Sequence, residues 1–381
     1  MPQLSKINIR GFRRLRDVSI DMRSLMVMIG GNGVGKTSML DALSLLSASA
    51  SGTMNKTLSD LGGIADVATS GYPEGIGFEA AMDIPGQCPL EYRLHLEVKG
   101  YTYQIAEEGL VQERGRKEPF KYLEAFRDNI CYFPTNNKKL VRPDWKYNNL
   151  ESALSQIPKM FREPEAFRNV LGSATKYHVL DVAKNSPIRL PQQMRPSGLP
   201  GSNGEELISF LYTLKETDPD RYEQIEDTLR AAFPRFEMLK FPPAAAGMLS
   251  LTWKETSFRN PVYIHQLSEG TLRFLWLISL LQSPVLPTIT LIDEPEVSLH
   301  PELLSLLADL LREASKRTQI VVATHSDRLI RFLKPEEVLV LDGDEEGHTQ
   351  VTWGDALDLK EWLQEYSLDD IWRMGPMGGR A

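Results

Sequence analysis

Residues Met26–Ser38 read MVMIGGNGVGKTS: an apolar run, a glycine-rich turn, a lysine and two hydroxyl side chains. They match the phosphate-binding loop G-x-x-x-x-G-K-[ST], a motif that requires a strand before it and a helix after it. Met26–Ile29 reads as that strand, and Met39–Leu43 reads as the start of that helix. Glycines let successive backbone N–H groups converge on phosphate oxygens, and the positive end of the helix dipole points to the same place. The stretch therefore predicts a binding site for a nucleoside triphosphate.

The residue types within this loop indicate separate roles. Lys36 is expected to neutralise the β- and γ-phosphates, and Thr37 to offer its hydroxyl to Mg²⁺. A chance lysine after a glycine-rich turn is the alternative, but the flanking strand and helix favour the nucleotide site. The positions expected to bind nucleotide are Gly30, Gly31, Asn32, Gly33, Val34, Gly35, Lys36, Thr37 and Ser38.

The composition is that of a globular protein with a substantial core, because 42% of the 381 residues are hydrophobic and 25% are charged. A net charge of −8 argues against broad, non-specific coating of nucleic acid but is compatible with a local basic patch. The two cysteines, Cys88 and Cys131, suggest no disulfide framework, which fits a cytoplasmic protein. The N-terminal sequence has no apolar signal region. The most apolar window, Phe274–Ile292, is interrupted by two prolines, so we expect a helix, a turn and a strand there and no membrane span.

The spacing of apolar residues predicts the order of the elements. Residues 4–10 alternate and read as a strand, a second strand begins at Val18, and residues 76–113 read as an antiparallel meander. We expect a single ATPase domain over 1–381, in which 1–134 carries the phosphate loop and the meander, 135–260 is an inserted, mostly helical lobe, and 261–381 carries the remaining motifs and the C-terminal strands and helices. The predicted helices of the lobe are 150–157, 164–171, 205–215 and 221–233, and its predicted strands are 236–239 and 249–253.

Two further segments each allow two interpretations. The arginines of Arg10–Arg16 lie either on a solvated hairpin or, at Arg13 or Arg14, near the nucleotide or DNA. The Pro/Gly-rich connector Pro187–Gly204 is either a surface loop or a segment that faces the nucleotide. In the second case the side chains concerned are Gln192, Gln193 and Arg195.

A second motif ends the apolar strand of Thr288–Glu294, which reads TITLIDE. In a phosphate-loop protein an aspartate at this place, here Asp293, holds Mg²⁺ directly or through water. Glu294 points the other way and can polarise the attacking water. An ordinary strand cap is the alternative, and the upstream phosphate loop disfavours it.

Weaker signals gain meaning from their order in the chain. Leu267–Thr271 begins a long apolar helix with a serine and a glycine, which offer a hydroxyl and free N–H groups to an anion, although alone it is only a good helix cap. Ile320–Ser326 is an apolar strand ending at His325, whose neutral imidazole is suited to hydrogen-bond the γ-phosphate or the attacking water. The loop Pro295–Pro301 is either a helix entry or a subunit interface next to the partner's active site.

The order of the motifs resembles that in the head of ABC-type ATPases. The motifs are, in chain order, Gly30–Thr37, Leu267–Thr271, Leu291–Glu294 and His325. The chain is more similar to the RecF, OLD-family and chromosome-maintenance proteins than to transporters, and similar above all to the bacterial group of predicted "AAA family ATPases". The details that carry this distinction are Gly11-Phe12-Arg13-Arg14, Asn32, Glu294-Pro295-Glu296-x-x-Leu299-His300-Pro301, Thr324-His325-Ser326 and the element Trp372–Gly379. The resemblance implies an α/β P-loop NTPase of ABC-ATPase type, with a mixed central sheet, an antiparallel β subdomain and a helical lobe inserted between the Walker A and signature motifs.

The same resemblance implies roles for single residues. Thr37 with Asp293 holds Mg²⁺, Glu294 is the catalytic base, and His325 is the switch histidine, acting beside Lys36. Arg13 matches an early arginine of the family and assists at the nucleotide.

The signature motif implies a second copy of the chain. Ser268 and Gly270 are expected to contact the γ-phosphate of ATP bound to the other protomer, so the active site is complete only in a head-to-head homodimer. The sequence departs from the family pattern in two ways. No clear motif anchors the lobe-connecting glutamine, for which Gln192 and Gln193 are the candidates. We also expect no long coiled coil, and no metal-binding acidic domain after His325 of the kind found in OLD proteins.

The sequence thus predicts an ATPase with ATP and Mg²⁺ as ligands, whose ATP-driven dimerisation acts as a switch in DNA-related maintenance, such as DNA repair, or in phage defence. The alternative is a slow, ATP-gated scaffold that controls a separately encoded effector, a nuclease or a toxin. DNA is a further expected partner, and a membrane is not. A transporter subunit is disfavoured by Glu294–Pro301 and by the large insertion, and a kinase by the lack of an acceptor site.

Overall fold

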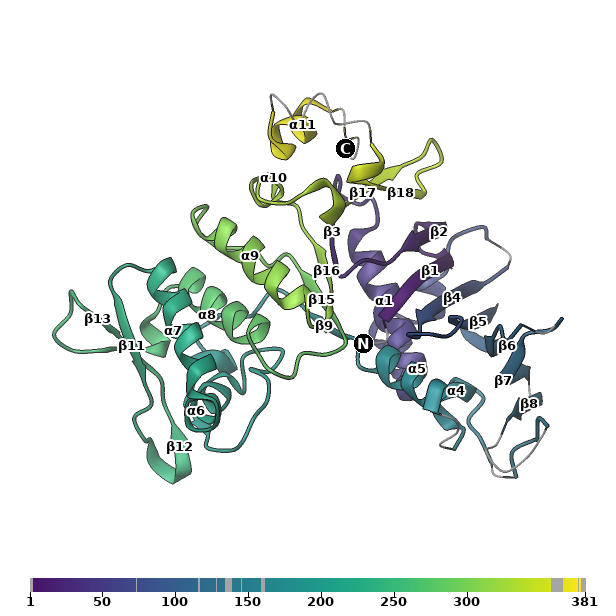
Figure 1. Ribbon diagram of the computed structural model, residues 1–381, viewed down its shortest axis with the longest axis horizontal. Helices are drawn as coiled ribbons and strands as arrows, with labels where there is room; N and C mark the ends of the chain where they lie inside the picture. Colours follow the sequence, from purple (N-terminus) through teal and green to yellow (C-terminus); the bar gives the residue numbers. More distant parts are fainter. Residues whose placement is uncertain are drawn as a thin grey trace.

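The computed structural model describes residues 3–72, 74–115, 117–127, 129–133, 139–144, 146–158, 162–357, 366–375 and 377. Figure 1 shows a central sheet with helix α1 and an antiparallel sheet on one side, and a helical lobe on the other. The C-terminal hairpin and α11 lie at the top of this view.

The central sheet has six strands in the order β18-β17-β3-β16-β15-β9, and only β18 runs antiparallel to its neighbour. Its strands are β3 (Leu25–Ile29), β9 (Thr175–Tyr177), β15 (Ile289–Asp293), β16 (Gln319–Ala323), β17 (Val338–Gly343) and β18 (Thr349–Trp353). The phosphate loop, the pair Asp293–Glu294 and His325 lie at the carboxyl ends of β3, β15 and β16 respectively. Because the carboxyl ends of parallel strands share one edge, the sheet gathers these motifs.

Side-chain alternation along the central strands divides the core in two. Met26 and Met28 belong to one buried cluster, shared with α1 and the antiparallel sheet. Leu25, Val27 and Ile29 belong to the other, shared with the helical lobe and α9. Residues on both faces of β3 are buried, which explains its continuous apolar run.

The antiparallel sheet has the order β2-β1-β4-β5-β6-β7-β8. Its strands are β1 (Gln3–Phe12), β2 (Leu15–Asp21), β4 (Ile76–Asp83), β5 (Leu90–Lys99), β6 (Thr102–Gln112), β7 (Phe120–Phe126) and β8 (Asn129–Tyr132). The predicted meander is therefore confirmed. The amide of Gln319 in β16 links the two sheets, since its Oε1 accepts from the Leu4 N–H at 2.9 Å and its Nε2 donates to the Leu4 carbonyl at 2.8 Å.

Helices cover the inner face of the antiparallel sheet. They are α1 (Lys36–Ser51), α2 (Met54–Asp60), α3 (Ile64–Val67), α4 (Ala153–Gln156) and α5 (Arg162–Gly172). Helix α1 ends at Gly52, whose φ of 75° gives a left-handed cap. Helix α4 is shorter than the predicted 150–157. It ends before Ile157, which precedes Pro158 and is extended, and it begins only after Ser152, whose ψ of 140° is not helical.

The helical lobe follows β9. It contains η1 (Pro187–Arg189), β10 (Gln192–Gln193), α6 (Leu207–Thr217), α7 (Pro219–Ala232), β11 (Phe236–Lys240), η2 (Ala245–Gly247), β12 (Met248–Leu249), β13 (Thr252–Glu255), β14 (Val262–Tyr263), η3 (Ile264–Gln266) and α8 (Glu269–Leu281). The connector is more structured than a plain loop, because β10 pairs with β12 and Ile188 is buried. The predicted strand 249–253 is divided, since β12 and β13 join different sheets. Helices α4 and α5, within the expected lobe 135–260, pack instead into the cluster around α1.

The C-terminal part contains α9 (Leu303–Ser315), α10 (Asp327–Ile330), η4 (Pro335–Glu337), η5 (Gly354–Ala356) and α11 (Leu368–Met374), besides β15 to β18. Of the element Trp372–Gly379, Pro376, Gly378 and Gly379 lie outside the described residues. Among the residues that the structure describes, no helix has both the length and the apolar character needed to cross a membrane.

Candidate ATPase site

The phosphate loop has the backbone that its sequence predicts. Gly30, Gly33 and Gly35 have φ values of 154°, 74° and 110°, all in the range that side-chain-bearing residues rarely adopt. A Cβ on Gly30 would lie 2.3 Å from the Leu341 carbonyl oxygen, and one on Gly35 would lie 2.5 Å from Oγ1 of Thr349. The two glycines at the ends of the loop are therefore required both by backbone conformation and by contact with β17 and β18.

The ammonium group of Lys36 is buried inside the loop. Its Nζ donates to the carbonyls of Gly30 at 2.7 Å and Gly31 at 2.8 Å. Burial lowers the pKa of Lys36 to about 8, although the carboxylates of Glu294 and Asp293 oppose this shift. A buried ammonium that is bonded only to neutral carbonyls would be stabilised further by the negative charge of a phosphate.

The two acids end β15 beside the loop. Burial raises the pKa of Asp293, and the ammonium of Lys176 acts against this rise. Glu294 has a φ of 48°, a rare value for a side-chain-bearing residue, and its N–H donates to the Ala323 carbonyl at 2.8 Å. Backbone strain of this kind is concentrated at functional sites.

A third acid, Glu296, holds the histidine loop in place. Its Oε1 accepts hydrogen bonds from the Thr324 hydroxyl at 2.6 Å and from the His325 N–H at 3.2 Å. His325 Nε2 lies 3.8 Å from Glu294 Oε1. Burial, and then the charge of Lys36, lower the pKa of His325 below 6.5, which favours the neutral imidazole. In the sequence, Glu296 stands out only as part of the loop after the two acids, and its spacing from Glu294 is the one available signal.

A charge cluster connects α1 to β15. Asp41 Oδ1 lies 2.6 Å from Lys176 Nζ, and its Oδ2 lies 2.5 Å from Arg13 Nη1. The Lys176 ammonium also lies 3.8 Å from Asp293 Oδ2. Arg13, a predicted site residue, therefore points toward the helix that follows the phosphate loop. Sequence reasoning missed Asp41 and Lys176; Asp41 follows Thr37 by one helical turn, whereas nothing in a three-residue strand marks Lys176.

The other arginines of Arg10–Arg16 are largely engaged with carboxylates. Arg10 lies 3.3 Å from both Asp17 and Glu79, and Arg16 lies 2.7 Å from Glu346. These pairs fit the solvated hairpin better than an open basic patch for nucleic acid.

The signature residues lie at the start of α8, in the helical lobe. Ser268 caps the helix by accepting from the Thr271 N–H at 3.2 Å, and its side chain is exposed. In the part of the chain that the structure describes, no hydrogen bond or ion pair joins 268–271 to 30–38. Gly270 instead approaches the loop after the acids, because a Cβ there would lie 2.5 Å from the Ser298 carbonyl oxygen. One chain thus brings together Lys36, Asp293, Glu294 and His325, but not Ser268 and Gly270.

The glutamines of the connector are engaged within the helical lobe. Gln192 is buried, its Nε2 donates to the Gly204 carbonyl at 2.6 Å and its Oε1 accepts from the Ile208 N–H at 2.8 Å. The Gln193 carbonyl accepts from Ser209, and Arg195 pairs with Glu206. The residue that follows the strand beside β15 is His178, which, when protonated, acts like Lys176 against the rise in the pKa of Asp293.

A Mg²⁺ ion, which the fold implies, fits the residues present. Thr37 is exposed at the start of α1, and Asp293 presents a largely buried carboxylate at the same sheet edge. A hydroxyl and a carboxylate are oxygen donors, the type that Mg²⁺ prefers alongside phosphate oxygens.

The comparisons with known proteins agree with this fold. A head of an Smc protein, solved bound to the C-winged helix domain of ScpA, matches with a TM-score of 0.56 and 14% identity over 93% of this chain and 99% of that one. A second Smc head with an extended coiled coil, bound to a C-terminal domain of ScpA derived from Pyrococcus furiosus, matches with a TM-score of 0.53 and 14% identity over 96% of this chain and all of that one. A search of curated protein sequences gave no significant match.

A protein-family model described as "AAA domain, putative AbiEii toxin, Type IV TA system" matches residues 25–331. This range spans every motif from the strand before the phosphate loop to beyond His325. The predicted fold class is confirmed: a mixed α/β P-loop ATPase fold of ABC type with an antiparallel subdomain and a helical lobe. The chain belongs to this family of AAA-domain proteins and is an ABC-type ATPase in fold.

Proposed function

We propose that this protein binds ATP with Mg²⁺ and hydrolyses it at a composite site formed by two copies of the chain, which act as an ATP-driven switch in DNA-related maintenance or phage defence. The observation that carries the proposal is the convergence of four chemically matched groups at one sheet edge. They are Lys36, Asp293, Glu294 and His325, which come from three different motifs.

Each group has a role suited to its surroundings. Lys36 would exchange its two carbonyl partners for the β- and γ-phosphates. Thr37 and Asp293 would hold Mg²⁺, which supplies positive charge to the phosphate oxygens when bound. Glu294, with its backbone fixed by the Ala323 carbonyl, would take the proton of the attacking water. The neutral imidazole of His325, anchored through Glu296, would orient that water or the γ-phosphate.

The exposed signature serine supports a composite site. Ser268 and the first turn of α8 present a hydroxyl and backbone N–H groups, yet these groups make no polar contact with the phosphate loop of their own chain within the described residues. A second copy, facing the first, would bring this helix end to the γ-phosphate and complete the charge compensation.

The direct test is Mg²⁺-dependent phosphate release by the purified protein, with Lys36→Ala as the control. We expect turnover that falls to background in Lys36→Ala. Turnover equal to the control would remove the main support for a hydrolase. ADP binding by calorimetry, measured separately, distinguishes a protein that binds without hydrolysis from one that does not bind.

A second candidate is the slow, ATP-gated scaffold for a separately encoded nuclease or toxin. It is motivated by the family description, which names a putative AbiEii toxin and a Type IV TA system. Affinity purification of Glu294→Gln from its native cell extract in ATP, then in ADP, tests it. A partner retained only with ATP supports the scaffold, and failure of any protein to co-purify contradicts it.

A further inference from the structure

We infer that the β17–β18 hairpin holds the phosphate loop in its nucleotide-binding shape, and that Thr349 is the positioning residue through which it acts. The inference rests on the proposed nucleotide binding and adds a supporting structural element outside the sequence motifs. Thr349 lies in the C-terminal part of the chain, more than three hundred residues after the loop that it contacts.

The hairpin touches both ends of the phosphate loop. Thr349 is buried, with 5% of its surface exposed, and its hydroxyl donates to the Val34 carbonyl at 2.7 Å. The backbone N–H of Thr349 donates to the Arg14 carbonyl at 3.0 Å, which ties the hairpin to the turn after β1. At the other end of the loop, Leu341 of β17 lies directly against Gly30.

The contact to Val34 sets the direction of a donor in the loop. In a planar trans peptide, the carbonyl of Val34 and the N–H of Gly35 point in opposite directions. Thr349 holds this carbonyl toward the hairpin, so the Gly35 N–H points away from the hairpin. Without the hydroxyl the carbonyl loses its partner, and the 34–35 peptide becomes free to turn. Gly35, with no Cβ and a φ of 110°, offers little resistance to that rotation.

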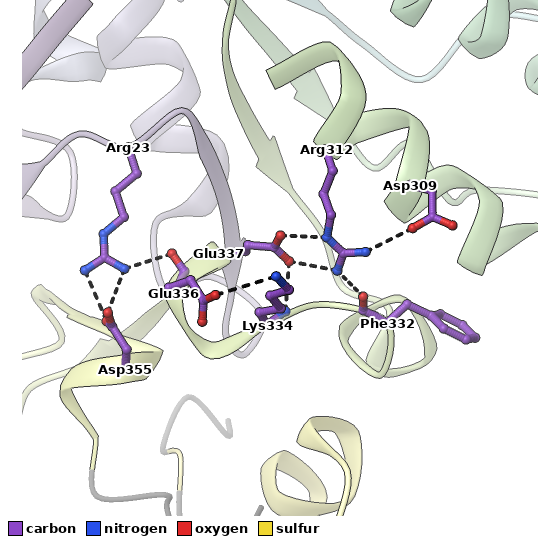
Figure 2. Close-up of polar contacts among 8 residues, drawn as sticks. All are labelled: Arg23, Asp309, Arg312, Phe332, Lys334, Glu336, Glu337 and Asp355. Atoms are coloured by element: carbon purple, nitrogen blue, oxygen red, sulfur yellow. Dashed lines mark hydrogen bonds and ion pairs between the residues drawn. The ribbon is translucent and has the colours of Figure 1, made fainter. Parts of the chain in front are cut away.

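Polar contacts fix the base of the hairpin, as Figure 2 shows. Before β17, Glu337 of η4 accepts from Arg312 of α9 at 2.6 and 2.9 Å. After β18, Asp355 of η5 accepts from Arg23 at 3.0 and 3.1 Å, and Arg23 also donates to the Glu336 carbonyl at 2.8 Å. Both ends of the hairpin are therefore pinned, one to α9 and the other to the segment just before β3. A hairpin fixed at its base can hold the loop at Thr349 in one position.

The test compares variants by calorimetric titration with Mg²⁺ and ADP, and by the kinetics of ATP turnover. Thr349→Val removes the hydroxyl at nearly constant shape, Thr349→Ser keeps it, and Thr352→Val makes the same change at an exposed position of β18. We expect Thr349→Val to raise the Kd for ADP and the KM for ATP about threefold to tenfold, the range for one lost hydrogen bond. The kcat at saturating ATP should change much less, and the other two variants should stay within about twofold of wild type.

Two results would overturn the inference. One is wild-type affinity in Thr349→Val, and the other is an equal loss in Thr349→Ser, which would assign the effect to shape rather than to the hydroxyl. Melting temperatures without nucleotide show whether each variant folds, and Thr349→Ala gives the same comparison if Thr349→Val does not fold. If wild type itself bound no nucleotide, the proposed function would fail first; if wild type binds and Thr349→Val binds equally, only the hairpin inference fails.

Discussion

The ammonium of Lys176 lies 3.8 Å from the carboxylate of Asp293, the residue that we propose to hold Mg²⁺. Both side chains are largely buried, at 9% and 17% exposure, so their charges are weakly screened by water. Among the described residues, Lys176 carries the closest cation to this carboxylate and favours its ionised form. When no nucleotide is bound, Lys176 would thus supply part of the positive charge that Mg²⁺ would supply in the complex with Mg²⁺ and nucleotide.

Replacing Lys176 should therefore make the protein more dependent on its ligand. In Lys176→Met the carboxylates of Asp41 and Asp293 lose a shared cation, and we expect a lower melting temperature without nucleotide. Mg²⁺ with ADP should restore more stability to this variant than to wild type, because the metal replaces the missing charge. The measurement is the rise in melting temperature on adding Mg²⁺ and ADP, with the exposed Lys184→Met as control. A rise equal to or smaller than that of wild type would contradict the argument.

The composite site predicts a trapped dimer. In Glu294→Gln the phosphates still bind but the water is not activated, so ATP should persist and hold two copies together. Size-exclusion chromatography with light scattering should show twice the monomer mass with ATP and the monomer mass with ADP.

The matched control adds Ser268→Arg to the same chain. Because Ser268 is exposed and caps α8 without touching its own phosphate loop, a bulky side chain there should block the partner's γ-phosphate and restore the monomer. An unchanged monomer peak for Glu294→Gln in ATP would rule out the sandwich dimer.

The histidine predicts the acid side of the pH profile. The pKa of His325 lies below the ordinary 6.5, so its imidazole is mainly neutral at pH 7 and becomes protonated only at more acidic pH. Lys36, with a pKa of about 8, is largely charged at pH 7, so the kcat for ATP should hold as pH falls from 7 to 6.5 and decline below that. In His325→Gln the neutral amide does not titrate, so kcat should be lower and its decline should move to still lower pH. If the decline kept its midpoint in His325→Gln, the histidine would not be the titrating group.

The motifs at the ends of β3, β15 and β16 could be predicted because each combines an apolar strand with a local run of functional residues. Strand endings and parallel pairing then place Lys36, Asp293 and His325 together with no further information. The fold class followed from the order of the same motifs.

The supporting residues could not be predicted, because each depends on pairing between distant segments. Thr349 reaches Val34 only because β18 lies at the far edge of the sheet, and Lys176 reaches Asp293 only because β9 pairs with β15. Neither residue lies in a motif, and the strand that carries Lys176 has three residues. The packing of α4 and α5 beside α1 could not be predicted either, because the apolar spacing of a helix does not show on which side of the sheet the helix packs.

Glu108 gives a test of stability that is independent of the nucleotide site. Its buried carboxylate accepts four hydrogen bonds, from Tyr92 at 3.0 Å, Ser152 at 2.7 Å, and the N–H groups of Ala153 at 2.7 Å and Leu154 at 2.9 Å. These bonds join β6 to the first turn of α4, where the N–H groups have no partner within the helix. In Glu108→Gln an amide NH₂ replaces an acceptor, so at least one of these donors is left unpaired in the interior.

We expect Glu108→Gln to lower the free energy of unfolding by about 3 kcal/mol, the cost of breaking a buried, charge-assisted network. Urea denaturation measures this change, and Glu107→Gln is the matched control on the same strand. Glu107 pairs with Arg93 at 2.9 Å, but both side chains are roughly half exposed, so its replacement should cost about 0.5 kcal/mol or less. Equal unfolding midpoints for the two variants would show that the Glu108 network does not fix α4 to the sheet.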